Sequence, residues 1–347
     1  MRVTAASILV SALGSLALLA SCSSAPTPAS APGGGRTSPH RTPLIVDDDG
    51  SADGVAAMIY LYYSPAFETK AWTVSPGEAH PGTFAAKLAR LQARLGITDV
   101  PIAAGPETPT TGTNAFPDAW RASSDAFWGL PLPDGGPAVD GRSAAQVMVD
   151  VVKASPEPVV IVETGPQTNL AQAFALDPSI KDSIKLVEVM GGAIKVPGNI
   201  RDGVPQSPNT TAEWNAFVDP AAAEAVFTSG IPIRLMPLDT TNKVVFTSDQ
   251  VKRLRASKNP GAGVIADILE WELKSFNPSG VNAWDLATAV DLAHPELTKV
   301  DPVHIVVITD QGPNQGQTLA TSAAPASVSV CSQPDTNGFR NRLVQEF

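Results

Sequence analysis

Short apolar runs alternate with segments of helical periodicity from residue 44 onward. The expected strands are 44–46, 70–74, 158–162, 186–190, 233–236 and 303–308, and the helices that follow the first three cover 53–63, 82–95 and a segment starting near Gln167. Continuous apolar strands separated by helices are typical of a buried parallel sheet. The pattern therefore predicts an α/β fold, a single Rossmann-like domain with a mostly parallel central sheet and helices on both faces.

Polar residues follow several of these strands. The clusters are Asp47-Asp48-Asp49, Thr164-Gly165, Met190-Gly191-Gly192 and Asp239-Thr240-Thr241. In open parallel sheets, ligands bind beyond the carboxyl ends of the strands, so the active site is expected among these clusters. The chain has no G-x-G-x-x-G motif, which leaves out the dinucleotide fingerprint.

The first 42 residues differ from the rest of the chain. Arg2 is followed by small and apolar residues up to Ala20, as in a signal peptide, and Leu19-Ala20-Ser21-Cys22 resembles a bacterial lipobox. We therefore expect a lipoprotein signal peptide over residues 1–21, a lipid on Cys22, a disordered tether over 22–42 and the folded domain over 43–347. The protein would then be extracytoplasmic and anchored to the bacterial cell membrane by lipid alone. The alternative is an ordinary secreted protein with an incidental cysteine.

Composition narrows the classes of partner and site. The 347 residues include 24 Lys and Arg against 34 Asp and Glu, a formal charge of −10, which argues against a nucleic-acid partner. Cys22 and Cys331 are the only cysteines, too few for a disulfide framework or a multi-cysteine metal site. With Cys22 acylated, Cys331 is expected to be a buried apolar residue. The Pro-rich stretch over 106–137 is interpreted as a lid or binding loop.

Four acids gather at the end of the first expected strand. Asp47, Asp48 and Asp49 are adjacent, and Asp53 follows at the start of the next helix. Adjacent carboxylates repel one another, and a bound cation is a common reason for such a cluster. The other interpretation is a solvated turn in which Asp53 caps the helix. An EF-hand is excluded, because position 12 counted from Asp47 is Met58.

Four blocks in order resemble the nucleoside hydrolase family of the inosine-uridine-preferring type. The family patterns are D-x-D-P-G-x-D-D, T-G-P-x-T-N-x-A, M-G-G…G-N…A-E-[FW]-N…D-P, and a late Asp. The matching segments here are residues 47–54, 164–171, 190–220 (with Met190-Gly191-Gly192, Gly198-Asn199, Ala212-Glu213-Trp214-Asn215 and Asp219-Pro220), and Trp284-Asp285 after Asp239. The resemblance covers the whole expected domain.

The resemblance implies a reaction and a set of roles. It implies calcium-dependent hydrolysis of the N-glycosidic bond of ribonucleosides to free base and ribose, with a nucleoside as the partner and self-association as a possibility that the family offers. Carried over by motif, Asp49 is a calcium ligand and the general base, while Thr164 and Asp285 are further calcium ligands. The implied substrate contacts are Asp53 and Asn215 on the ribose hydroxyls, Asn199 and Glu213 at the 5′ end, and Met190 in the sugar pocket.

Two positions of the metal-binding pattern depart from the family. Gly54 stands where the family has a metal-binding acid, which predicts weak calcium binding. Asp53 points about 100° away on the helix, and Asp48 is a candidate replacement that faces opposite to Asp49 on the strand. Glu78 replaces a family asparagine and would restore the charge if it reaches the ion. The alternative function that follows from Gly54 is a weakened or inactive nucleoside-binding or ribose-binding lipoprotein on the same scaffold, in which Gly54→Asp alone would restore hydrolysis.

The residues expected to contact the leaving nucleobase also differ from the family pattern. Trp284 stands where purine-cleaving members have a histidine, and an indole has no titratable proton. Trp284, Phe127 and Trp128 are expected to stack on the nucleobase. His80 is a further candidate acid.

Overall fold

The computed structural model describes residues 41–347 except residue 323. The expected signal peptide, Cys22 and the tether up to residue 40 lie outside the described residues. The first strand begins at Thr42, one residue before the expected start of the folded domain.

A nine-stranded sheet forms the centre of the described part, in the order β3-β2-β1-β4-β5-β6-β9-β7-β8. All neighbours pair in parallel except β7, which is antiparallel to β9 and to β8. The predicted mostly parallel sheet is thus confirmed, while three short strands, β3, β8 and β9, were not predicted. The bounds are β1 Thr42–Asp48, β2 Phe67–Val74, β3 Ile102–Ala104, β4 Val159–Glu163, β5 Ile184–Met190, β6 Ile233–Met236, β7 Lys299–Val307, β8 Thr318–Thr321 and β9 Val328–Ser332.

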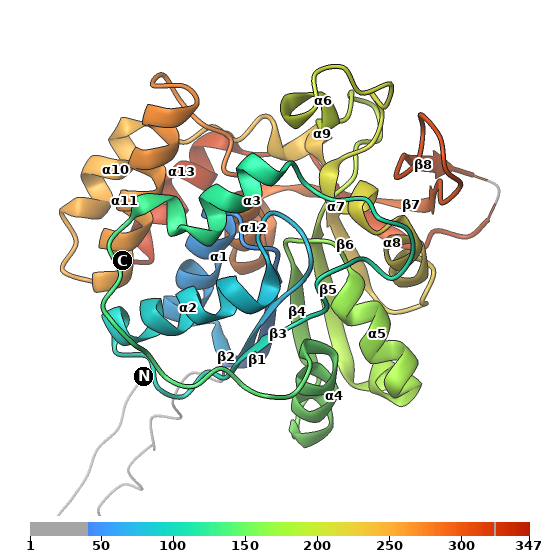
Figure 1. Cartoon of the computed structure of the whole chain (residues 1–347). Coiled ribbons are helices and arrows are strands. Elements are labelled where there is room, and N and C mark those ends of the chain that lie inside the picture. The colour runs from blue at the N-terminus through green and yellow to red at the C-terminus, as the bar shows by residue number, and fades with distance from the viewer. Residues whose placement is uncertain (1–40, 323) are drawn as a thin grey trace, which may run out of the picture. The chain divides into compact units, whose positions relative to one another are not determined.

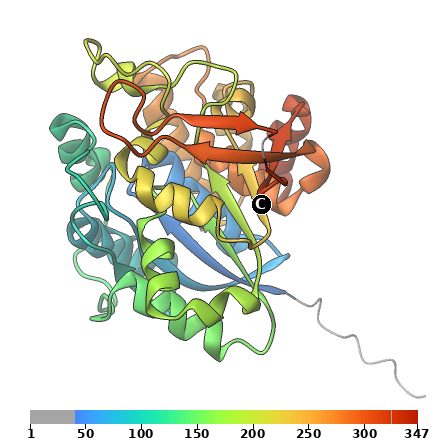
Figure 2. The same cartoon turned by 90° about the vertical axis from the view of Figure 1, so that its right-hand side faces the viewer.

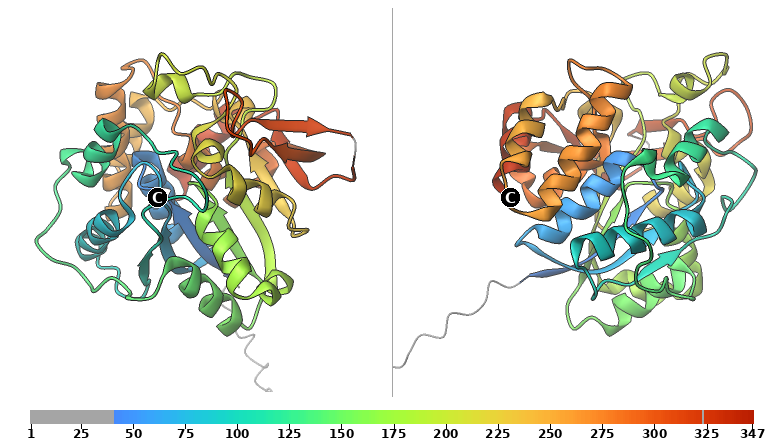
Figure 3. Two further views of the ribbon diagram at one scale, coloured as in Figure 1. Left: turned by 45° about the vertical axis from the view of Figure 1, so that its right-hand side comes forward. Right: turned by 60° about the vertical axis from the view of Figure 1, so that its left-hand side comes forward.

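Helices cover both faces of this sheet, as predicted (Figures 1 and 3). One face carries α1 Ala52–Tyr63, α2 Pro81–Leu95, α10 Ser248–Arg255, α11 Pro260–Ser275, α12 Trp284–Ala293 and α13 Thr336–Gln345. The other face carries α4 Ala144–Ala154, α5 Thr168–Leu176 and α8 Pro220–Phe227. Four short helices lie toward the carboxyl edge of the strands, namely α3 Asp118–Asp125, α6 Ile200–Gly203, α7 Trp214–Val218 and α9 Leu238–Thr241. Short 3-10 turns cover Phe127–Gly129, Pro178–Ser183 and Pro295–Leu297.

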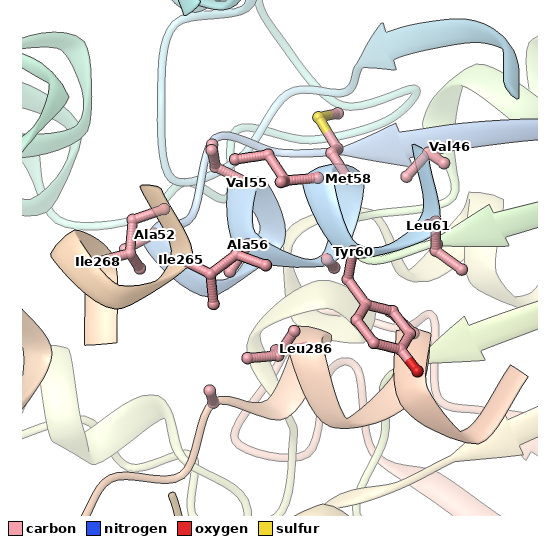
Figure 4. Packing of buried hydrophobic residues seen from close by; sticks show 14 of the residues in the cluster. Val46, Ala52, Val55, Ala56, Met58, Tyr60, Leu61, Ile265, Ile268 and Leu286 are labelled. Carbon is pink, nitrogen blue, oxygen red and sulfur yellow. The ribbon is translucent and has the colours of Figure 1, made fainter. Parts of the chain in front are cut away.

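Side-chain alternation along β1 separates two apolar cores. Leu44 and Val46 point to the core under α1, while Ile45 points to the core under α4 and α5. Helix α1 is enclosed by neighbours, because α11 and α12 both pack against it, and α12 also contacts β5 of the sheet; Figure 4 shows Ile265 of α11 and Leu286 of α12 beside it. This double cover fixes the start of α1 against the end of β1, where the acids lie.

The chain closes the sheet with an antiparallel edge. β7 and β8 form a hairpin beyond β9 (Figure 2). Among the described residues, we find no helix with the length and apolar character that a membrane span needs.

Candidate active site

The strand order places the functional loops at a crevice of the sheet. β1 lies between β2 and β4, so the connections after β1 and after β4 leave the sheet toward opposite faces. Asp49 directly follows β1, and Thr164 directly follows β4; the Thr164 N–H donates to the Asp47 carbonyl at 2.8 Å. Ligands of doubly wound sheets bind at such a switch point.

A cavity of about 680 Å³ opens at this point, within the range of small-molecule sites. None of the described residues that line it is Lys, Arg or His. The sequence-predicted residues that line it are Asp49, Asp53, Glu78, Trp128, Thr164, Met190, Asn199, Glu213, Asn215, Trp284 and Asp285. The family order of the motifs therefore brings together side chains from segments more than 230 residues apart.

Five acids lie at the floor of the cavity, and we call them the floor acids. Asp49, Asp53, Glu78 and Asp285 line the cavity, and Asp48 lies behind the lining, in contact with Ser51 and Thr164. Asp49 Oδ2 accepts the Glu78 N–H at 3.2 Å, and Asp53 Oδ2 accepts the Asp285 N–H at 2.9 Å. Gly77 is required here, because a Cβ at that position would lie 2.2 Å from Asp49 Oδ2. Backbone donors and a missing side chain thus hold the Asp49 carboxyl toward the cavity.

Burial raises the pKa of every floor acid, and repulsion by neighbouring acids adds to this rise for all of them except Asp53. Burial is the main cause for each; it raises the pKa of Asp53 to about 6, of Asp48 to about 7 and of Glu78 to about 8. The pKa values of Asp49 and Asp285 are also well above the ordinary value, with repulsion from neighbouring floor acids as a further cause. Hard divalent cations prefer oxygen ligands, and the cavity lining offers carboxyl oxygens with no Lys, Arg or His beside them. The donor set therefore fits such an ion.

Strand alternation does not remove Asp48 from this site. The Asp48 side chain points to the α1 side of the sheet, where its Oδ1 accepts the Gly50 N–H at 2.8 Å and its Oδ2 accepts the Thr164 hydroxyl at 2.9 Å. The start of α1 lies on that same side, so an orientation opposite to Asp49 brings Asp48 next to residue 54. Sequence reasoning placed Asp48 on the face opposite to Asp49, but it did not predict that this face brings Asp48 next to residue 54.

The sugar-side residues are tied to one another by hydrogen bonds. Glu213 accepts N–H groups of Gly192 at 3.0 Å and Asn215 at 2.9 Å. The Asn215 amide donates to the carbonyls of Thr164 at 3.3 Å and Met190 at 3.2 Å. These contacts position Asn215 and Thr164 together and explain why the two motifs occur as a set. Asn199 extends this network by accepting the Trp214 N–H at 3.0 Å.

The outer part of the cavity is aromatic. Phe116, Trp120 and Trp128 from the 106–137 stretch line it, so this stretch is a cavity-forming loop as interpreted. Trp271, Phe276 and Trp284 line the same cavity, and the Trp284 indole N–H donates to Asn242 at 2.7 Å.

Two aromatic or basic candidates lie elsewhere. Phe127 is 1% exposed and packs against Phe84, with ring centroids 6.0 Å apart, so it supports the core beneath Trp128 and does not line the cavity. His80 also lies outside the cavity lining, and its ring Nδ1 is 2.7 Å from Asp125 Oδ2. Phe127 was expected to stack on the nucleobase and His80 was a candidate acid, but neither residue lines the cavity.

Glu272 is a cavity residue that sequence reasoning missed. It lies on α11, is 6% exposed and lines the cavity next to Trp271. Its Oε2 has no hydrogen-bond partner among the described residues, and burial, with repulsion from Asp53 and Glu78, raises its pKa well above the ordinary value. An acid three and four residues after Leu269 and Ile268, in the apolar stripe of a helix, was the available signal.

A second buried acidic group lies among β5, β6, β9 and α12. The ligand atoms of Glu188, Asp291 and Cys331 lie within 4.8 Å of one another, a grouping that has the donors for a metal ion. Arg234 already provides a cation there, because its guanidinium bonds Asp291 and lies 3.5 Å from Glu188 Oε2. Cys331 is buried as expected, but its surroundings are polar, since its Sγ is 3.5 Å from Arg234. We call these four residues the Arg234 cluster.

Comparisons with known proteins agree with the fold and the motif order. Residues 44–341 match the family model described as inosine-uridine preferring nucleoside hydrolase. The chain is 31% identical over 314 residues to the pyrimidine-specific ribonucleoside hydrolase RihA of Shewanella woodyi, covering 88% of this chain and 97% of that protein. It is 32% identical over 315 residues to RihA of Citrobacter koseri, with coverage of 88% and 97%.

Solved structures show the same architecture. The plant nucleoside hydrolase PpNRh1 superposes with a TM-score of 0.77 at 23% identity, covering 88% of this chain and 99% of that one. The purine-preferring ribonucleoside hydrolase from Gardnerella vaginalis superposes with a TM-score of 0.75 at 25% identity, covering 88% and 98%. The family model matches most of the chain, and the family's motifs occur in order around the cavity. This chain therefore belongs to the inosine-uridine-preferring nucleoside hydrolase family and is an N-ribosyl hydrolase.

Proposed function

We propose that this protein is a calcium-dependent ribonucleoside hydrolase that releases free base and ribose. The observation that carries the proposal is the cavity floor, where several buried carboxyl groups face one another without a lysine, arginine or histidine in the lining. Asp49, Asp285 and the Thr164 carbonyl would hold the ion. When bound, the ion supplies positive charge that acidifies the attacking water and gives the ribose hydroxyls a docking point.

The residues of the chain divide the remaining work. The Asp49 carboxylate accepts a proton from the attacking water, a contribution of typically ~10²–10⁴-fold. Asp53 and Asn215 hold the ribose hydroxyls, Asn199 and Glu213 hold the 5′ end, and Met190 packs against the sugar. The carboxylates near the anomeric carbon stabilise the positive charge that develops as the N-glycosidic bond breaks.

The aromatic outer part of the cavity would hold the nucleobase. Trp128 and Trp284 offer ring faces for stacking, and Trp120 and Trp271 add apolar area around them. Both pyrimidine-specific and purine-preferring enzymes are among the relatives, and an aromatic wall accepts either ring system.

Ribose release from a nucleoside panel tests the activity. The full-length chain is incubated with purine and pyrimidine ribonucleosides in millimolar calcium, after chelation, and after calcium is restored, and free ribose is measured. We expect release with calcium, loss of release on chelation and recovery on restoration. Unchanged rates after chelation would refute the calcium requirement, and no release from any nucleoside in calcium would refute the activity.

We also propose that the protein is held outside the cytoplasm by a lipid on Cys22. Support comes from the sequence of the first 22 residues, in which an apolar stretch ends at Leu19-Ala20-Ser21-Cys22. Feeding a bacterial host that makes the full-length chain with a tagged fatty acid should label the protein, and Cys22→Ser should abolish the label. An unlabelled parent chain would refute the anchor. Self-association stays a prediction, which sedimentation of the purified protein would measure.

A further inference from the structure

Residue 54 has no room for a side chain in this structure. A Cβ on Gly54 would lie 1.7 Å from Asp48 Oδ2, 2.5 Å from Asp48 Cγ and 2.6 Å from Ser51 Oγ. Real Cβ atoms essentially never approach other heavy atoms within 3.0 Å. The Asp48 carboxyl and a side chain at residue 54 therefore exclude each other.

The Asp48 carboxyl lies directly behind the cavity lining, where it contacts the lining residues Ser51 and Thr164. It is fully buried and accepts the Gly50 N–H and the Thr164 hydroxyl. The Ser51 hydroxyl lies between two floor acids, 3.5 Å from Asp48 Oδ2 and 2.6 Å from Asp285 Oδ2. Asp48 thus shares contacts with Thr164 and, through Ser51, with Asp285, two of the residues that would hold the ion.

We propose that Asp48 supplies the carboxylate that the family places at residue 54, so that the third acid of the cation site comes from strand β1 and not from helix α1. We call this move of the acid from residue 54 to residue 48 the exchange. The inference rests on the proposed calcium dependence. It also explains how the site keeps its charge without an acid at residue 54.

Asp47 is a matched comparison for Asp48. The two acids are neighbours on β1, both are fully buried, and burial raises the pKa of each to about 7. The Asp47 side chain lies on the opposite face of the sheet, where its Oδ1 accepts the Asn169 amide at 2.8 Å. A general effect of removing a buried acid would appear in both variants, whereas an effect on the ion should appear only for Asp48.

Calcium affinity of the full-length chain, measured by titration calorimetry without nucleoside, tests the exchange. We expect Asp48→Asn to weaken calcium binding by about 100-fold or more, because affinity depends steeply on the charge of the ligands. Asp47→Asn should keep the parent affinity within about threefold. Circular dichroism of each variant establishes that it is folded.

Moving the acid back is the sharper test. Gly54→Asp alone should weaken calcium binding, because the new side chain collides with Asp48. Asp48→Ala together with Gly54→Asp should bind calcium at least 10-fold more tightly than Asp48→Ala alone. Near-parent affinity in Asp48→Asn, tighter binding in Gly54→Asp alone, or no gain in the double variant would each overturn the exchange. If the parent itself binds no calcium, the proposed calcium dependence fails instead.

A separate observation concerns departure of the nucleobase. Trp284 has no titratable proton and His80 lies outside the cavity, whereas Glu272 lines it with an unpartnered carboxyl oxygen. The geometry points to Glu272 as the acid that protonates the leaving base. As the bond from C1′ to the base nitrogen breaks, the Glu272 O–H proton moves to the base while the proton of the attacking water moves to Asp49. Solvent then returns both residues to their starting states.

A substrate whose leaving group needs no proton separates this role from a structural one. In Glu272→Gln, kcat for nucleosides should fall by about 100-fold. Hydrolysis of 4-nitrophenyl β-riboside should stay within about threefold of the parent, because 4-nitrophenolate departs unprotonated. Glu270→Gln, on the same helix but paired with Arg255 at the surface, is the control and should match the parent on both substrates. Equal losses on both substrates, or no loss on nucleosides, would overturn the assignment.

Discussion

Two groups of buried acids in this protein, the floor acids and the Arg234 cluster, differ in whether the chain itself supplies a cation beside them. The floor acids and the Arg234 cluster are joined by one helix, since α12 carries Asp285 at its start and Asp291 near its end. In the Arg234 cluster a guanidinium of the chain itself forms ion pairs with both Glu188 and Asp291. At the floor, the described lining of the cavity offers no cationic side chain, and all the floor acids except Asp48 line the open space.

The difference teaches where an external cation is needed. Buried carboxylates stay charged only when something compensates them. The Arg234 cluster receives a cation from the fold itself, so we assign it to stability. The floor acids remain uncompensated until a cation binds, so we assign them to the reaction.

The largest effect on stability is expected from removing the internal cation. Arg234→Gln should lower the free energy of unfolding by about 3–5 kcal/mol, because two buried carboxyls lose their partner. Denaturant titration measures it. Arg255→Gln, which breaks exposed ion pairs with Asp267 and Glu270, should cost about 1 kcal/mol or less. Equal losses in the two variants would contradict the distinction between the clusters.

The largest effect on activity is expected from Asp49. Asp49→Asn should lower kcat/KM by about 10³-fold, because the amide cannot accept the proton of the attacking water. The same substitution should leave the free energy of unfolding of the chelated protein unchanged or higher, because one repelling acid is removed. Ribose release and denaturant titration measure the two quantities. A stability loss like that of Arg234→Gln would place Asp49 with the structural acids.

Calcium is expected to stabilise the floor and not the Arg234 cluster. At a concentration 100 times the dissociation constant, calcium should add about 2.7 kcal/mol to the free energy of unfolding. The gain should persist in Arg234→Gln and be much smaller in Asp285→Asn. A gain that disappears in Arg234→Gln would show that the ion binds at the other cluster.

The pH dependence of the calcium-free protein gives a more gradual effect. The floor acids have folded pKa values above their unfolded values of about 4, for example about 6 for Asp53 and about 8 for Glu78. Between these values the folded state binds more protons, so the free energy of unfolding should fall as pH rises from about 4 through 6–8. The slope is about 1.4 kcal/mol per pH unit for each such group. Saturating calcium should flatten the fall, and a rise of stability over this range in chelator would contradict it.

Sequence reasoning reached the sheet and most of the cavity, because both leave local signals. Long apolar runs predicted the central strands, whereas β3 and β8 have only three and four residues and carry too little periodicity to be recognised. Motif order predicted residues such as Asn215 and Asp285, which line the cavity together. Their roles in catalysis stay predictions until the variants are measured.

The misplaced residues show what local patterns leave out. Phe127 is next to Trp128 in the chain and their ring centroids are 4.9 Å apart, but Phe127 is buried in the core and only Trp128 lines the cavity. Glu272 was overlooked because it belongs to none of the recognised motifs, although an acid in the apolar stripe of a helix was a signal. In both cases the direction of a side chain depends on packing partners that are distant in sequence.

The sequence by itself determined the family, the positions along the chain of the strands that carry the acids, and the absence of an acid at residue 54. Only the tertiary structure decided what fills that gap, because the Asp48 carboxyl and the start of α1 meet through the packing of a helix on a strand end. It also decided which buried acids already have a cation, since Arg234 reaches Glu188 and Asp291 across neighbouring elements. Charge compensation is a property of distances in space, and spacing along the chain does not contain it.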